Sequence, residues 1–199
     1  MALTINHQTN DISATSGSVT IDGAAAGGGG SWNLISTTTV SSSASAVNFT
    51  GLSDGTYYKA VLAGVKSSSG VPAVYLRVSR NSAIKTGAEY KYVLDTYTAG
   101  SSTISTSSSS GSTHFPIGDA PSATGGGSQT ELFIYNTTAN RSTLFSRSIY
   151  ADSNANSSAR LLFGSDYTDT SNAIDGLSFL LASGTIEAGT FSLYSLVTS

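Results

Sequence analysis

Hydrophobic and polar residues alternate along several short stretches of this chain, which is the period of a β-strand with one buried face. In the stretch 73–80, Val74, Leu76 and Val78 alternate with Tyr75 and other polar or amphipathic residues. Similar stretches, bounded by turn residues, predict further strands at 57–65, 89–97, 130–138, 142–151, 158–166, 173–183 and 185–197. No segment keeps a 3.6-residue hydrophobic period over three turns. We therefore expect an all-β protein with an antiparallel β-sandwich or jelly-roll-like body.

The start of the chain differs from the rest. Residues 1–22 hold two short alternating stretches with too little apolar surface to form a core of their own. An Ala/Gly run follows at 23–30, and glycine-rich runs are flexible. We expect an extended N-terminal arm at 1–22, a hinge at 23–30 and the β-sandwich body at 31–199. The alternative is a frayed terminus without a role.

The segment 98–128 is rich in Ser, Gly and Thr and separates two groups of predicted strands. Such a composition predicts a long loop within the body. Structureless loops of this length are uncommon in compact domains, and those that occur are often functional or mobile.

Composition narrows the classes of protein that fit. Charged residues make up 11% of the chain, against roughly 25% in typical soluble domains. Ser and Thr take their place, which favours strands and turns over helices. With a net charge of −3 we expect no nucleic-acid partner, and without a long apolar run we expect no membrane partner.

The chain has no cysteine, which excludes disulfides and thiolate metal sites and leaves the redox compartment open. The first residues lack the basic start and apolar stretch of a secretory signal. These features fit a protein made in a cytoplasm and later exposed in an assembly, and they also fit an ordinary cytoplasmic protein.

Candidate chemistry is sparse. His7 and His114 lack neighbouring ligands at metal-binding spacing, and no G-x-S-x-G motif accompanies the many serines. Asp166, Asp169 and Asp175 give an oxygen-rich stretch, which without the spacing of an EF-hand is better interpreted as a solvated loop than as a calcium site. We expect no enzyme activity, no cofactor and no metal.

Tyrosine is the enriched residue type with binding potential. Tyrosines on the face of a sheet stack on sugar rings or anchor protein interfaces, although tyrosine is also an ordinary strand residue. The candidates for facing a ligand are Tyr75, Tyr90, Tyr92 and Tyr97.

Three stretches carry a family resemblance. They are WNLISTTTVSSSASAVNFTGL at 32–52, YKAVLAGV at 58–65 and LSFLLASGTIEAGTFSLYSL at 177–196, preceded by the opening LTINHQTNDIS at 3–13. Together they resemble small β-rich virion structural proteins of tailed bacteriophages, which include head decoration or cement proteins and fibre-type proteins. The family offers no catalytic motif to carry over.

The resemblance implies a virion component, assembled in the host cytoplasm, that forms a homotrimer. The leading hypothesis is a capsid decoration or cement protein that binds the major capsid protein or another virion protein. Its arm would make that contact through Leu3, Ile5, Ile12, Val19 and Ile21. One alternative is a tail or head fibre that binds a host glycan through the 98–128 segment and the tyrosines. Another is a carbohydrate-binding module of non-viral origin.

Overall fold

The computed structural model describes residues 3–6, 11–14, 20–21, 24–25, 31–122, 124–138, 141–151, 157–166 and 172–197. Side chains are described from residue 31 onward, other than that of Asp166. The regular elements in these ranges are all β-strands. They are β1 (Leu3–Asn6), β2 (Asp11–Ala14), β3 (Thr20–Ile21), β4 (Ala24–Ala25), β5 (Trp32–Val40), β6 (Ala46–Thr50), β7 (Thr56–Ser67), β8 (Ala73–Arg80), β9 (Ala83–Ile84), β10 (Tyr90–Thr98), β11 (Ile104–Ser112), β12 (Phe115–Asp119), β13 (Gly127–Asn136), β14 (Thr143–Ala151), β15 (Ser157–Asp166), β16 (Gly176–Leu181) and β17 (Ile186–Leu196).

The chain forms two compact units, Met1–Asn33 with Leu196–Ser199, and Leu34–Ser195. In the first unit β1 pairs antiparallel with β2, and β3 pairs antiparallel with β4. The predicted hinge at 23–30 falls largely outside the described residues. An arm that contacts a partner stays a prediction.

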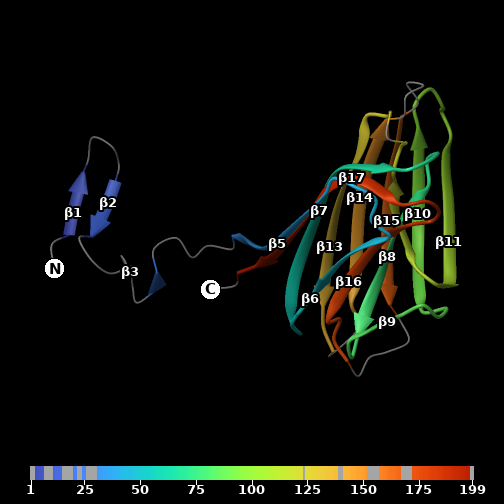
Figure 1. Ribbon diagram of the computed structural model, residues 1–199. Helices are drawn as coiled ribbons and strands as arrows, with labels where there is room; N and C mark the ends of the chain where they lie inside the picture. The colour runs from blue at the N-terminus through green and yellow to red at the C-terminus, as the bar shows by residue number, and fades with distance from the viewer. Residues whose placement is uncertain are drawn as a thin grey trace. The chain divides into compact units, whose positions relative to one another are not determined.

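The second unit is a sandwich of two sheets, whose strands can be followed in Figure 1. The larger sheet has eight strands in the order β11-β10-β15-β14-β13-β7-β17-β5. The smaller sheet has the order β12-β8-β16-β6, with β9 paired to β8. Neighbours such as β13 with β14, and β8 with β16, are antiparallel. The predicted all-β antiparallel sandwich is confirmed, while a jelly-roll strand order stays a prediction.

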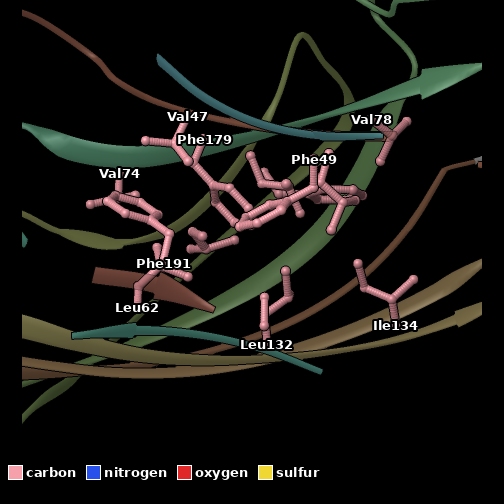
Figure 2. Close-up of a cluster of buried hydrophobic side chains, with 14 of the residues drawn as sticks. Val47, Phe49, Leu62, Val74, Val78, Leu132, Ile134, Phe179 and Phe191 are labelled. Atoms are coloured by element: carbon pink, nitrogen blue, oxygen red, sulfur yellow. The ribbon is translucent and has the colours of Figure 1, made fainter. Parts of the chain in front are cut away.

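The core lies between the two sheets and draws on both, as Figure 2 shows. Val74, Leu76 and Val78 of β8 are buried, as their alternation predicted. Across the sandwich, the rings of Phe179 and Phe191 have centroids 5.9 Å apart. Because burial of one such side chain contributes about 2–3 kcal/mol, this shared cluster holds the two sheets together.

The segment 98–128 is not the long loop that its composition predicted. It contains all of β11 and β12. The Ser-rich β11 is an exposed edge strand, where main-chain pairing with β10 sets the conformation and side chains matter little. The five residues of β12 are all buried beneath the larger sheet. The buried apolar residues Phe115 and Ile117 indicate the strand β12, but the overall Ser, Gly and Thr content of the segment outweighs them.

Candidate docking surface

One face of the eight-stranded sheet points away from the five-stranded sheet, and we call it the outer face. The residues of the outer face are identified by strand alternation, because the neighbours of a buried residue along a strand point to the opposite side of the sheet. Its members in the centre of the sheet are Lys59, Val61, Val93, Asp95, Tyr97, Gln129, Glu131, Phe133, Phe145, Arg147, Ile149, Leu161 and Phe163.

A row of aromatic rings crosses this face because three neighbouring strands each carry a Leu-Phe dipeptide. The dipeptides are Leu132-Phe133 on β13, Leu144-Phe145 on β14 and Leu162-Phe163 on β15. Each leucine is buried in the core, so each phenylalanine faces outward. The register places Phe145 opposite both Phe133 and Phe163. We call these three rings the aromatic row.

The aromatic row is packed within itself and open to solvent at one end. Ring centroids are 6.2 Å apart for Phe133 and Phe145, and 5.2 Å apart for Phe145 and Phe163. Phe163 is 54% exposed, and Val93, opposite it on β10, is 46% exposed. At the other end, the Lys59 Nζ lies 5.5 Å from the Phe133 centroid, within cation–π range.

A charged cluster lies beside the aromatic row. Glu131 accepts a charge-assisted contact from Lys59 Nζ at 3.0 Å and a hydrogen bond from Arg147 Nε at 2.6 Å. The hydrogen bonds from Lys59 and then from Arg147 hold the pKa of the Glu131 carboxyl below its usual value. Glu131 is therefore ionised at neutral pH, and the three side chains carry one net positive charge.

A shallow groove of about 540 Å³ lies on the outer face on the far side of the charged cluster, which separates the groove from the aromatic row. Tyr97, Gln129 and Ile149 line it together with residues of β15. Tyr97 is 36% exposed and Ile149 is 58% exposed. Exposed apolar side chains therefore line the groove, separately from the aromatic row.

Tyr90 is not a ligand-facing residue, so that prediction is wrong. The side chain is fully buried, and its ring packs edge to face against Phe115 at 4.8 Å. Its hydroxyl accepts a hydrogen bond from Val78 N at 3.0 Å and donates one to Lys85 O at 2.8 Å. Tyr90 faces inward because it is an even number of residues from the buried Leu94 of β10, and such residues lie on the same face of a strand.

The other three candidate tyrosines do not form one site. Tyr92 is half-buried and packs against the core, from the inner side of the sheet. Tyr75 lies on the smaller sheet, where its ring stacks on His114 with centroids 3.5 Å apart. Burial and then the nearby Arg77 lower the pKa of His114. Tyr97 is the candidate that lies on the outer face.

The remaining candidates are placed only in part. Leu3, Ile5, Ile12 and Ile21 lie in the short strands of the first unit, with Ile5 opposite Ile12, whereas Val19 lies outside the described residues. Their contact with a capsid protein stays a prediction. His7 and Asp169 also lie outside the described part of the chain.

Asp175 has a local backbone role. Its Oδ2 accepts a hydrogen bond from Ser82 N at 2.5 Å, in the turn between β8 and β9. Among the described residues, no three His, Asp or Glu side chains gather in a way that would hold a metal ion.

The aromatic row does not follow from the alternation of any one strand taken alone. The signal was present, since the same Leu-Phe dipeptide occurs in three strands that are consecutive along the chain. Consecutive antiparallel strands joined by short turns pair with each other. Each dipeptide places Leu on one face of its strand and Phe on the other. If the leucines are buried in the core, the phenylalanines form an apolar surface on the opposite face of the sheet.

Behind the outer face, a carboxyl group is buried between the sheets. Asp119 of β12 is 5% exposed, and its Oδ2 lies 2.8 Å from an Arg160 guanidinium nitrogen of β15. Burial raises the pKa of Asp119 to about 6, against the opposing effect of Arg160. The folded protein thus binds this proton more tightly than the unfolded chain, whose carboxyl has a pKa of about 4.

This buried carboxyl predicts a pH dependence of stability. Because the folded state keeps the proton between about pH 4 and pH 6, the free energy of unfolding falls as pH rises through that window, by about 3 kcal/mol. The loss is complete above pH 6. Urea unfolding at pH 4 to 7 measures it, with Asp119→Asn as the comparison. The difference in the free energy of unfolding between wild type and Asp119→Asn should change between pH 4 and pH 6. A difference that stays constant over this range would contradict the raised pKa of Asp119.

Comparison with known proteins adds no relative. No family model matches the chain, and no curated protein or solved structure is significantly similar to it. Within the described residues there is no helix able to cross a membrane. Any function assigned to the outer face therefore rests on its chemistry and on the sequence resemblance.

Proposed function

We propose that this chain is a structural protein of a bacteriophage virion, a trimeric decoration or cement protein whose sandwich docks on a neighbouring virion protein. The aromatic row on the outer face is the observation that carries the proposal. The centres of protein interfaces are enriched in aromatic residues and arginine. The outer face combines three phenylalanines with Arg147, whose charge is already paired with Glu131.

Internal pairing of the charges favours a protein partner. Docking against a protein removes water from the face, and an unpaired charge buried in this way is costly. Glu131 already accepts from both Lys59 and Arg147, so the cluster enters an interface with its charges paired internally and with one net positive charge left for the partner to match. Phenylalanine also brings no hydroxyl or indole N–H that would need a partner after desolvation.

Repetition strengthens such a contact. A decoration protein occupies many equivalent positions, and a trimer engages its partner through three copies of the face at once. Linked contacts raise the overall affinity without any new contact. The N-terminal arm would add a second attachment, by pairing its short strands with the edge of a capsid sheet.

Electron microscopy of purified virions, labelled with an antibody against the exposed strand β11, tests the location. The proposal expects regular label over the head. Label confined to the tail or to fibre ends would instead support a receptor-binding fibre protein. Virions without label, from a preparation in which the antibody recognises the isolated protein, would contradict a virion role.

The groove on the outer face favours one second candidate, a fibre protein that binds a host glycan. Tyr97 offers a partly exposed ring, and Gln129 offers an amide with both donors and an acceptor. Stacking on a ring combined with planar polar groups suits a sugar. Saturable binding on a glycan array, abolished by Tyr97→Ala, would favour this candidate over decoration.

A further inference from the structure

Two tyrosine side chains stack on each other near one end of the larger sheet. Tyr57 lies at the start of β7 and Tyr135 near the end of β13, and the register places them directly opposite each other. Their ring centroids are 4.4 Å apart, with an angle of 22° between the ring planes. Carbon atoms in contact are about 3.5–4.0 Å apart, so the two phenol rings touch over part of their faces. We call these two residues the tyrosine pair.

Hydrogen bonds beside the tyrosine pair fix the main chain that carries it. Asn136, the neighbour of Tyr135, donates through its Nδ2 to Ser53 O at 2.8 Å. Thr138 N donates to Asp54 Oδ1 at 2.7 Å. Both bonds join the turn before β7 to the residues at the end of β13. The two rings are therefore held opposite each other by the fold as well as by the strand pairing.

The tyrosine pair is open to solvent. Tyr57 is 47% exposed, and Tyr135 is half-buried. The pair lies on the outer face, because Tyr135 is two residues from Phe133 on β13 and such residues share a face of the strand. An oxidant in solution therefore reaches the phenol of Tyr57 directly.

Contacting phenols have a characteristic oxidative chemistry. Loss of one electron and one proton turns a phenol into a phenoxyl radical, whose unpaired electron is shared with the ring carbons next to the C–O carbon. Two such radicals in contact combine through those carbons. The chain has no cysteine, so a bond of this kind offers a covalent link between strands where a disulfide is excluded.

We propose that the tyrosine pair is a modification site, at which a peroxidase-type oxidant joins Tyr57 to Tyr135 as a dityrosine. Each phenol gives one electron to the oxidant and its hydroxyl proton to water. A carbon–carbon bond then forms between a Cε atom of one ring and a Cε atom of the other. The hydrogen on each of these carbons moves through water to the phenolic oxygen, which restores both aromatic rings. Two electrons and two protons have then left the protein, and they reduce one hydrogen peroxide to two waters.

The link fastens together two strands in the middle of the larger sheet. Strands β7 and β13 lie side by side there, as can be followed in Figure 1. The bond closes the chain between positions 57 and 135, so it restricts the unfolded state as a disulfide of that span would. It leaves the aromatic row unchanged. This inference goes beyond the proposed function and does not depend on it.

The fold makes the reaction selective for this pair. Tyr97 is also on the outer face and 36% exposed, but it lies on β10, three strands away from β13. At about 4.8 Å per strand, its ring is too far from Tyr135 for a bond. Coupling between groups already in contact within one chain is effectively unimolecular, so at micromolar concentration it is faster than coupling between chains.

Mass spectrometry of the full-length protein, treated with a peroxidase and hydrogen peroxide at micromolar concentration, tests the proposal. Single chains should lose two hydrogen atoms, and proteolytic mapping should find a branched peptide that joins the segments around positions 57 and 135. Tyr57→Phe and Tyr135→Phe should each abolish this peptide. The matched control is Tyr97→Phe, which should form it in the wild-type yield.

Thermal unfolding gives a second readout of the same bond. The cross-linked protein should unfold at a midpoint about 5 °C or more above that of untreated protein, because the link removes freedom from the unfolded chain. Tyr57→Phe treated in the same way should show no rise, which separates the effect of the link from that of other oxidised side chains.

Oxidation of the urea-unfolded chain completes the test, since the preference for positions 57 and 135 should disappear there. Three results would overturn the inference. They are a folded protein whose dityrosine is spread over several exposed tyrosines, links between chains without the branched peptide, or the same yield of that peptide from the unfolded chain. Each of these results leaves the virion role open, because antibody labelling tests that role separately.

Discussion

Replacing Asn136 with alanine should destabilise the sandwich by about 3–5 kcal/mol, because three main-chain groups would lose their partner at a buried position. Asn136 ends β13 and is fully buried. Its Nδ2 donates to Ser53 O at 2.8 Å and to Ile174 O at 2.7 Å, and its Oδ1 accepts from Ile174 N at 2.8 Å. One amide thus joins two segments that are far apart in sequence to the end of a central strand.

Chemical denaturation of Asn136→Ala measures this loss, and Asn136→Asp separates hydrogen bonding from volume. The aspartate keeps the shape but turns an acceptor toward two carbonyl oxygens, so it should be at least as destabilising as alanine. The control is Asn48→Ala on β6, where the side chain is exposed and the change should stay within about 0.5 kcal/mol. Tolerance of the aspartate would contradict the role of the amide.

Gly164→Ala should cost about 2–3 kcal/mol, because a methyl group has no room at this position. A Cβ on Gly164 would lie 2.6 Å from Phe115 Cε1 and 3.2 Å from the main-chain oxygen of Lys91. The Phe115 ring is fully buried and held against Tyr90, so it cannot swing aside. The glycine on β15 is therefore the space into which β12 packs.

A double-mutant cycle tests this fit directly. Phe115→Leu alone should destabilise by leaving a gap, and it should cost much less in the Gly164→Ala background, where the methyl group fills part of that gap. Urea midpoints of the two single variants and the double variant give the coupling energy. Strictly additive effects would show that the two residues do not share this space.

The sequence was sufficient to predict the fold class, because alternation is a local property. In β8 the buried set Val74, Leu76 and Val78 follows directly from the period of two. Interpretation failed where tertiary context decides. Tyr90 was predicted to be exposed, yet it shares a face of β10 with Leu94, and that face is buried. The alternation alone does not tell which of the two faces of a strand is buried. Six of the nine residues of strand β11 are Ser, so only its pairing with β10 defines it.

The outer face was within reach of prediction, but the exposure of edge strand β5 was not. Three Leu-Phe dipeptides in consecutive strands specify an exposed row of rings if those strands are neighbours. Leu34 of β5 lies on the inner side with the buried Val40, and its exposure depends on how far the smaller sheet extends over the larger one. The apolar pattern of a strand cannot report the extent of a sheet that packs against it.

The central claim is that the outer face attaches this protein to a virion, and the copy number per particle measures it most directly. Phage would be grown from a genome carrying the double variant F145E/F163E, and the protein in purified virions would be quantified by mass spectrometry against the major structural protein. The matched control is Ile84→Glu, on an exposed residue of the smaller sheet. Loss of two interface anchors should lower the copy number at least tenfold, with the control unchanged. Wild-type copy number for F145E/F163E, in a variant that remains folded, would contradict the account.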